Sequence, residues 1–311
     1  MADTPRDDEP RDDEYELEHE LSDELSGLPS SGPGQPPHDG GLTNPKDQKR
    51  FGGHPVGLYY LFFAELWERF SFYGMRALLT LYMVKRVFMD SEDKDELSYG
   101  VYAAYGSMVY LTPVIGGMLA DRITGYRNAI MLGGILMAIG HFVLAIETTV
   151  FFYLALAFLI VGNGFFKPNI STMVGTLYEE GDPKRDAGFT IFYMGINIGA
   201  WLSPLACGAV AEIWGWHAGF ALAGFGMVLG IIAFWLGGRA GVFGNRGLMP
   251  AAMKSAKRVL GLSQANLTYI ISFLIVPIVA LMIVHGPVDF FGTSMVLEGE
   301  ASKFLLYTLA A

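Results

Sequence analysis

Long apolar runs separated by short polar stretches dominate the chain after residue 50. Six of them are long enough to cross a hydrocarbon core of roughly 30 Å as helices rising about 1.5 Å per residue. They cover about residues 56–87, 97–120, 128–147, 150–177, 187–212 and 218–237. A seventh, over about 266–285, is also long enough to span, and an eighth begins at Lys303 and stops in mid-pattern at Ala311. The pattern predicts an all-α membrane protein whose chain is truncated.

Composition agrees with this fold class. Of 311 residues, 52% are hydrophobic and only 17% charged, and the mean hydropathy is +0.35. The net charge of -10 comes mainly from residues 1–50, which hold 14 acidic and 5 basic side chains. That segment, rich in charge and then in Pro, Gly and Ser, is predicted to be a disordered acidic tail. It lacks the basic start and apolar core of a signal peptide, and no feature of the chain indicates nucleic acid as a partner.

Basic residues gather at alternate ends of the apolar runs. The positive-inside rule therefore predicts a cytoplasmic N-terminus and a multi-pass protein of the inner or plasma membrane. The expected organisation is a tail over 1–50, a six-helix bundle over 51–240, a cytoplasmic linker over 241–265, and an extra membrane helix with the start of a further one over 266–311. The basic residues concerned are Lys46, Lys49, Arg50, Arg122, Arg127, Lys184, Arg185, Arg239, Arg246, Lys254, Lys257 and Arg258.

The first apolar run contains four ionisable side chains: Glu65, Glu68, Arg69 and Arg76. The first three follow i, i+3, i+4 spacing, so they share one helical face, and Arg76 lies two turns further on. A charge at bilayer depth costs on the order of 3 kcal/mol, so such groups persist where they face water or one another. This run predicts a polar transport pathway rather than a charged loop. Lys167, inside the fourth run, is a second interior cation, for which Glu65 and Glu68 are the available carboxylates.

The fifth run places Tyr193 and Asn197 on one face, where they can bind a polar ligand or bond to another helix. Gly195 and Gly199 lie on the neighbouring face and predict a packing surface. Between the second and third runs, the loop from Gly116 to Arg127 is either a structural turn or a conformational element.

Metal and redox chemistry have little support in the sequence. The single cysteine, Cys207, excludes an internal disulfide and a cysteine-based metal site. His141 stands alone in an apolar run and is interpreted as a packed or solvated histidine. No cluster of His, Asp and Glu has metal-ligand spacing.

Taken in chain order, these motifs resemble the proton-coupled oligopeptide transporter (POT, or PTR2) family of the major facilitator superfamily. The resemblance covers about residues 55–240. The matching pieces are Glu65-x-x-Glu68-Arg69-Phe70 with Tyr73-Gly74-x-Arg76, then GGMLADRITGYR, GNGFFKPNIS and FYMGINIGA. Two positions depart from it: Phe72 replaces the first tyrosine of a Tyr-Tyr pair, and Trp201 stands where a smaller aliphatic residue is usual.

The resemblance implies a role for each group of residues. Glu65 and Glu68 would be the proton-sensitive carboxylates with Arg69 as their fixed partner, and Lys167 would pair with one of them when it is deprotonated. The peptide's C-terminal carboxylate would bind Arg76 and Lys167, and the rest of the peptide would contact polar side chains. Those side chains are Tyr73, Tyr110, Tyr193 and Asn197, and the residues expected to steady one conformation are Gly117, Asp121, Arg122, Gly125 and Arg127.

The fold implied is the N-terminal six-helix bundle of a major facilitator protein with one or two extra helices, ending before a C-terminal bundle. The implied function is symport of protons with di- or tripeptides by alternating access, driven by the proton gradient without a cofactor. The expected partners are the peptide, protons, the lipid bilayer and a missing C-terminal half.

Other interpretations stay open. The chain could be an inactive half-transporter, or it could carry another small anionic solute. A seven-helix receptor fits the number of runs but not the basic residues before the first run. An enzyme lacks paired histidine ligands, a Ser/His pair and a reactive cysteine.

Overall fold

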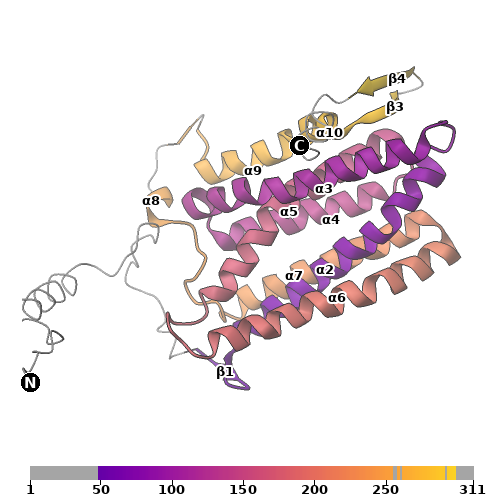
Figure 1. Ribbon diagram of the computed structural model, residues 1–311. Coiled ribbons are helices and arrows are strands. Elements are labelled where there is room, and N and C mark those ends of the chain that lie inside the picture. The colour runs from indigo at the N-terminus through magenta and orange to yellow at the C-terminus, as the bar shows by residue number, and fades with distance from the viewer. Residues whose placement is uncertain (1–47, 255–257, 260, 291–292, 299–311) are drawn as a thin grey trace, which may run out of the picture. The chain divides into compact units, whose positions relative to one another are not determined.

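The computed structural model describes residues 48–254, 258–259, 261–290 and 293–298 (Figure 1). Most of the expected tail and the eighth apolar run, which starts at Lys303, therefore lie outside the described residues.

Six long helices follow the six apolar runs, which confirms the all-helical fold class. Two of them continue as five-residue π-helices, η2 after α2 and η3 after α3. Their bounds are α2 Val56–Tyr82, η2 Met83–Val87, α3 Lys94–Leu119, η3 Ala120–Thr124, α4 Tyr126–Leu144, α5 Thr149–Gly175, α6 Arg185–Trp214 and α7 Trp216–Arg239.

A single glycine separates consecutive helices at two places in the chain. Gly125 precedes α4 with φ of 75°, and Gly215 alone separates α6 from α7 with φ of 92°. A side chain disfavours this left-handed region, so glycine ends one helix and permits the next to start in a new direction.

The six helices form two groups of three. In the first, α2 lies along both α6 and α7; in the second, α5 lies between α3 and α4 (Figure 1). Contacts between α4 and α7 join the groups. The interior is apolar along these contacts and includes Leu61, Met75 and Phe166.

Glycines set the closest approaches between helices. A Cβ atom at Gly199 of α6 would overlap the carbonyl oxygen of Leu66 and lie 3.0 Å from the amide nitrogen of Phe70 on α2. A Cβ atom at Gly195 would lie 3.0 Å from Phe62. The predicted packing surface on α6 is confirmed, and its partner is α2.

The seventh apolar run forms two helices, α9 (Gln264–Leu274) and α10 (Val276–Ile283). They are separated at Ile275 because Pro277, in the first turn of α10, has no amide hydrogen for a continuous helix. The run was expected to remain helical to residue 285, but His285 begins a strand. The strands β3 (His285–Phe290) and β4 (Thr293–Glu298) pair antiparallel, and the apolar pattern did not predict them.

Residues 241–250, inside the expected linker, pack against one end of the helices. Phe243 is fully buried and stacks on Phe234 with ring centroids 5.3 Å apart. The amide of Arg127 donates a 2.9 Å hydrogen bond to the carbonyl of Gly247. A short helix, α8 (Ala251–Lys254), follows; at the start of the described chain, β1 (Arg50–Phe51) pairs with β2 (His54–Pro55).

Candidate functional site

Among the described residues, six helical segments are long and apolar enough to cross a membrane. They comprise α3 with η3, α4, α5, α6, α7, and α9 with α10. The helix α2 is also long enough to cross a membrane, at 27 residues, but its interior carries the charged residues Glu65, Glu68, Arg69 and Arg76. The candidate site is therefore built around α2.

Glu65, Glu68 and Arg69 are all buried, with 2%, 0% and 4% of their surface exposed. The Nε atom of Arg69 donates a 2.8 Å hydrogen bond to Oε1 of Glu65 and lies 2.6 Å from Oε2 of Glu68. Oε2 of Glu65 and both oxygens of Glu68 have no hydrogen-bond partner among the described residues. Two carboxylates and one guanidinium leave one excess negative charge, which a proton or a further cation can neutralise in an apolar interior.

Close packing holds this triad in place. Gly199 of α6 lies against the backbone beside Arg69, and Gly230 of α7 lies against the backbone at Ala64 and Glu68. Neither contact brings a polar side chain to the carboxylates. Phe72 covers the guanidinium of Arg69, with the ring centroid 5.7 Å from Cζ.

Lys167 is half-buried on α5, and its Nζ atom lies 5.0 Å above the ring of Tyr110. The expected ion pair between Lys167 and a carboxylate of α2 is absent from the described structure, because Arg69 contacts both carboxylates. Lys167 therefore has no carboxylate within ion-pair distance among the described residues. Its stem and cation are stabilised instead by the π face of Tyr110.

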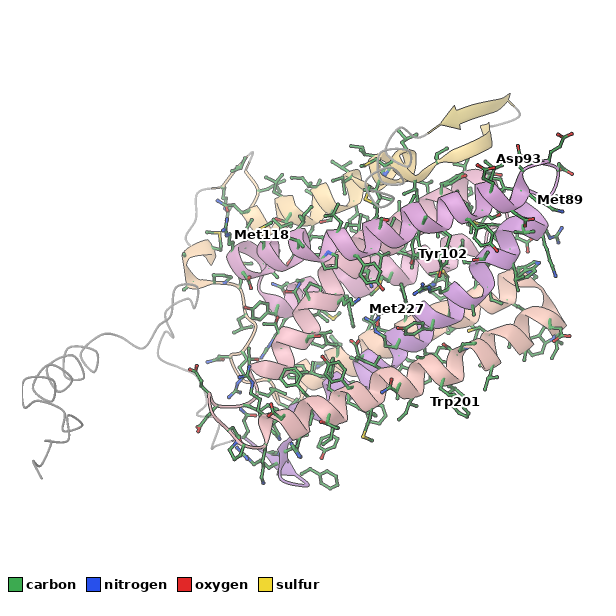
Figure 2. All side chains as sticks on the ribbon, viewed as in Figure 1. Met89, Asp93, Tyr102, Met118, Trp201 and Met227 are labelled. Atoms are coloured by element: carbon green, nitrogen blue, oxygen red, sulfur yellow. The ribbon has the colours of Figure 1, made fainter. Side chains whose placement is uncertain are left out.

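Arg76 is held by a phenol rather than by a carboxylate. Its Nε atom donates a hydrogen bond to the hydroxyl of Tyr102 on α3 (labelled in Figure 2), and its Cζ atom lies 5.3 Å from the centroid of that ring. No carboxylate in the described structure lies within ion-pair distance of Arg76. The guanidinium can therefore receive an anionic group of a ligand.

The remaining expected ligand contacts lie on exposed faces. Tyr110 on α3 is 68% exposed and Tyr193 on α6 is 57% exposed, and Asn197 is exposed on the same helix. The structure shows no bond from Tyr193 or Asn197 to the charges of α2 and α5. Trp201 is 71% exposed and points away from the neighbouring helices (Figure 2), so its bulk does not disturb the interior of the described bundle.

The loop from Gly116 to Arg127 is anchored through Arg127. Asp121 and Arg122 are both exposed, and Asp121 forms no ion pair among the described residues. The Arg127 guanidinium donates a hydrogen bond to the Gly244 carbonyl. The segment after α7, which sequence reasoning treated as a linker, supplies this acceptor.

Two further glycines shape the same region. A Cβ atom at Gly125 would lie 2.5 Å from the carbonyl carbon of Leu248, and one at Gly117 would make ordinary contact with Pro168 at 3.7 Å. Of these two, Gly125 alone is required by close packing.

Sequence reasoning missed Tyr102 on α3, which lies one turn before the buried Tyr105. Their i, i+3 spacing, with Tyr110 further along an otherwise apolar helix, is the signal that could have found Tyr102. Of the two interpretations left open for His141, packed or solvated, the structure shows the packed one: His141 is buried, and its Nε2 lies 2.5 Å from the hydroxyl of Ser71. Cys207 is also buried, and the described residues contain no His/Cys/Asp/Glu group able to hold a metal.

Comparison with known proteins shows the same family throughout. The family model described as the POT family, PTR2, matches residues 127–281. An uncharacterised transporter of Bacillus subtilis (strain 168), YclF, is 45% identical over 213 residues, which cover 67% of this chain and 43% of that protein. A di-/tripeptide transporter of Lactococcus lactis subsp. cremoris is 41% identical over 241 residues, covering 76% and 47%.

Solved structures agree. A peptide transporter POT in complex with sulfate has a TM-score of 0.61 and 41% identity, covering 76% of this chain and 48% of that one. A POT family transporter in complex with a thioalcohol-conjugated peptide has a TM-score of 0.63 and 38% identity, covering 75% and 47%. The chain thus spans about half the length of the relatives it matches.

The chain belongs to the POT family of membrane transporters. It is a multi-pass membrane protein of a transporter family, not an enzyme.

Proposed function

We propose that this chain carries the proton-coupling and carboxylate-binding part of a symporter for di- and tripeptides. The observation that carries this proposal is the buried triad of Glu65, Arg69 and Glu68, in which one guanidinium serves two carboxylates. Such a triad has two charge arrangements, with and without a proton, and each favours a different arrangement of the surrounding cations.

The coupling follows from the charges around Glu68. When Glu68 is ionised, it attracts Arg69 and Lys167; when it is protonated, Lys167 is free to bind another anion. Exchange between these arrangements would couple proton binding to alternating access. A membrane potential adds about 2.3 kcal/mol per charge per 100 mV and drives the proton inward.

A peptide's carboxylate would bind Arg76 and Lys167, which have no carboxylate partner within ion-pair distance in the described structure. The polar side chains of Tyr73, Tyr110, Tyr193 and Asn197 would contact the rest of the peptide. The relatives support this choice of substrate, because one is named a di-/tripeptide transporter and another is solved with a conjugated peptide.

We assign Gly117, Asp121, Arg122, Gly125 and Arg127 to a conformational role at the junction of η3 and α4. The contacts of Gly125 and Arg127 with residues 244–248 support this assignment, because movement at the junction would break them. The N-terminus is proposed to be cytoplasmic.

The test is uptake of labelled dialanine into lipid vesicles under an inward proton gradient. Because the chain spans about half the length of its relatives, it is reconstituted alone and together with the part of a relative that it does not cover. Glu68→Gln and Lys167→Ala are each expected to reduce proton-driven uptake at least tenfold, whereas Lys85→Ala, at an exposed position, leaves it unchanged. Unaltered uptake in Glu68→Gln would contradict the mechanism.

Two outcomes distinguish the alternatives. If uptake occurs only when the uncovered part of the relative is supplied, the result supports a half-transporter. If nitrate displaces bound dialanine as strongly as other dipeptides do, the result supports another small anionic solute as the substrate.

A further inference from the structure

A buried hydrogen bond joins α2 to α4, which belong to different groups of three helices. The Nε2 atom of His141 on α4 lies 2.5 Å from the hydroxyl oxygen of Ser71 on α2. Ser71 is 0% exposed and His141 is 1% exposed. The bond therefore lies in an apolar interior, where it is electrostatically stronger than in water and fixes the spacing of the two helices.

The hydroxyl of Ser71 bonds to a neighbouring helix rather than to its own. A serine inside a helix often donates to the carbonyl four residues earlier in the same helix. Ser98 and Ser107 of α3 do so, to the carbonyls of Lys94 and Ala103. Such bonds leave neighbouring helices unlinked, whereas the bond of Ser71 ties α2 to α4.

Close packing makes α4 and α5 one unit beside His141. A Cβ atom at Gly140 would lie 3.0 Å from the carbonyl oxygen of Ala155 and 3.0 Å from the side chain of Leu159, both on α5. Because the interior is close-packed, contact at this distance leaves α4 little freedom to move against α5. The bond between His141 and Ser71 therefore also fixes α2 relative to α5.

The helices α2 and α5 carry the two cations proposed to bind the peptide's carboxylate. Arg76 lies five residues after Ser71 on α2, and Lys167 lies on α5. Arg76 also links α2 to α3 through its bond to Tyr102, but a carboxylate that binds the guanidinium competes for that bond. The bond between Ser71 and His141 uses no group that the ligand would bind, so it persists when the peptide is present.

We propose that His141 is a positioning residue for the peptide: through Ser71 it holds α2 at a fixed distance from α5. At that distance, Arg76 of α2 and Lys167 of α5 bind one carboxylate together. No carboxylate lies within ion-pair distance of His141 in the described structure, so the imidazole is neutral and carries no proton for transport. This inference rests on the proposed function and adds the residue that sets the geometry of its anion site.

The first test measures the spacing of α2 and α5 in the purified chain in lipid nanodiscs and requires no transport. Spin labels are attached in Ala77→Cys and Ser171→Cys, at exposed positions of the two helices, while Cys207 is buried. Electron–electron double resonance is expected to give a narrow distance distribution in the parent and a broader one in His141→Phe. His141→Gln, whose terminal amide reaches the position of Nε2, should keep the distribution narrow, and the shorter His141→Asn should not.

The second test measures uptake of dialanine by the chain reconstituted with the part of a relative that it does not cover. His141→Phe and Ser71→Ala are each expected to raise the KM about fivefold, because a smaller fraction of molecules holds the binding-competent spacing. Ser98→Ala is the matched control: this serine is also 0% exposed but bonds within its own helix, so its KM should equal that of the parent.

A double variant separates positioning from a contribution to folding, and it also serves if His141→Phe alone does not fold. In Ser71→Ala/His141→Phe neither partner is left as an unpaired buried group, so the thermal stability lost in the single variants should largely return. The KM is expected to remain raised by about the factor of either single variant, since both remove the same bond. A merely structural role predicts instead that the KM recovers with the stability.

A parental KM in the double variant, or a parental distance distribution in that variant, would overturn the inference. Absence of uptake by the unmutated reconstituted protein would contradict the proposed function instead. The distance measurement needs no uptake, so it decides between a fixed and a loose α2 in either case.

Discussion

At the scale of single residues, Arg69 decides the charge balance inside α2. Its Nε atom lies close to both Glu65 and Glu68, so Lys167 has no carboxylate within ion-pair distance in the described structure and lies over Tyr110 instead. The i, i+3, i+4 spacing predicted that the three α2 side chains share a face. It did not predict which cation neutralises them, because that depends on how far α5 stands from α2.

Tyr178 offers a test of burial outside the membrane-spanning helices. It lies beyond the end of α5, and its hydroxyl is 2.9 Å from Nδ1 of His54. Burial raises the pKa of Tyr178 from 10.0 to about 12. Because the folded-state pKa is the higher one, the unfolded chain loses this proton first as the pH rises. The contribution of Tyr178 to the free energy of unfolding is therefore complete below pH 10 and is lost as the pH rises through about 12.

In Tyr178→Phe, the loss of thermal stability over this alkaline range is expected to be smaller than in the parent chain. Near neutral pH the variant should lose about 1 kcal/mol, the contribution of the hydrogen bond. Thermal unfolding followed by circular dichroism from pH 7 to 12 measures both effects. An alkaline loss identical to that of the parent would contradict the prediction.

At the scale of helices and strands, close backbone contacts determine the arrangement around the site. The sequence predicted a small-residue surface at Gly195 and Gly199, and the structure shows that its partner is α2. The apolar pattern also located all six spans of the bundle. It missed the break at Ile275 and the β3–β4 hairpin, because both depend on local backbone chemistry that an average over hydropathy conceals.

The crossing of α6 and α2 can be tested with one methyl group. In Gly199→Ala, the new Cβ atom meets the backbone of α2, so the helices must separate, with a loss of about 1–3 kcal/mol in the free energy of unfolding. Gly208→Ala, on the same helix with nothing within 4 Å of its Cβ position, is the control and should be neutral or slightly stabilising. Equal stability of the two variants in a denaturant titration would show that the crossing is not tight.

At the scale of the whole described chain, successive spanning helices run in opposite directions and their connections gather at two ends. One end contains the connections at 120–125, 176–184 and 240–250, and the other contains those at 88–93 and 145–148. At the second end, Glu147 lies 3.8 Å from Arg86 and 3.4 Å from His217, so it links three parts of the chain.

This alternation makes a prediction about membrane topology. Lys184→Cys and Asp93→Cys, both at exposed positions, should react with an impermeant maleimide from opposite sides of a sealed vesicle. With a cytoplasmic N-terminus, only Asp93→Cys is labelled from outside. Cys207 is fully buried, so the parent chain should stay unlabelled; labelling of both variants from one side would contradict the topology.

The sequence by itself determined the spanning helices, the shared face of Glu65, Glu68 and Arg69, and the family. It could do so because helix length, helical period and motif order follow directly from the order of residues along the chain. Only the tertiary structure decided that Arg69 serves both carboxylates, that Tyr102 joins the site, and that residues 241–250 cover Gly125 and Arg127. Those contacts depend on how each helix is rotated and spaced against its neighbours, which close packing at glycines such as Gly199 sets.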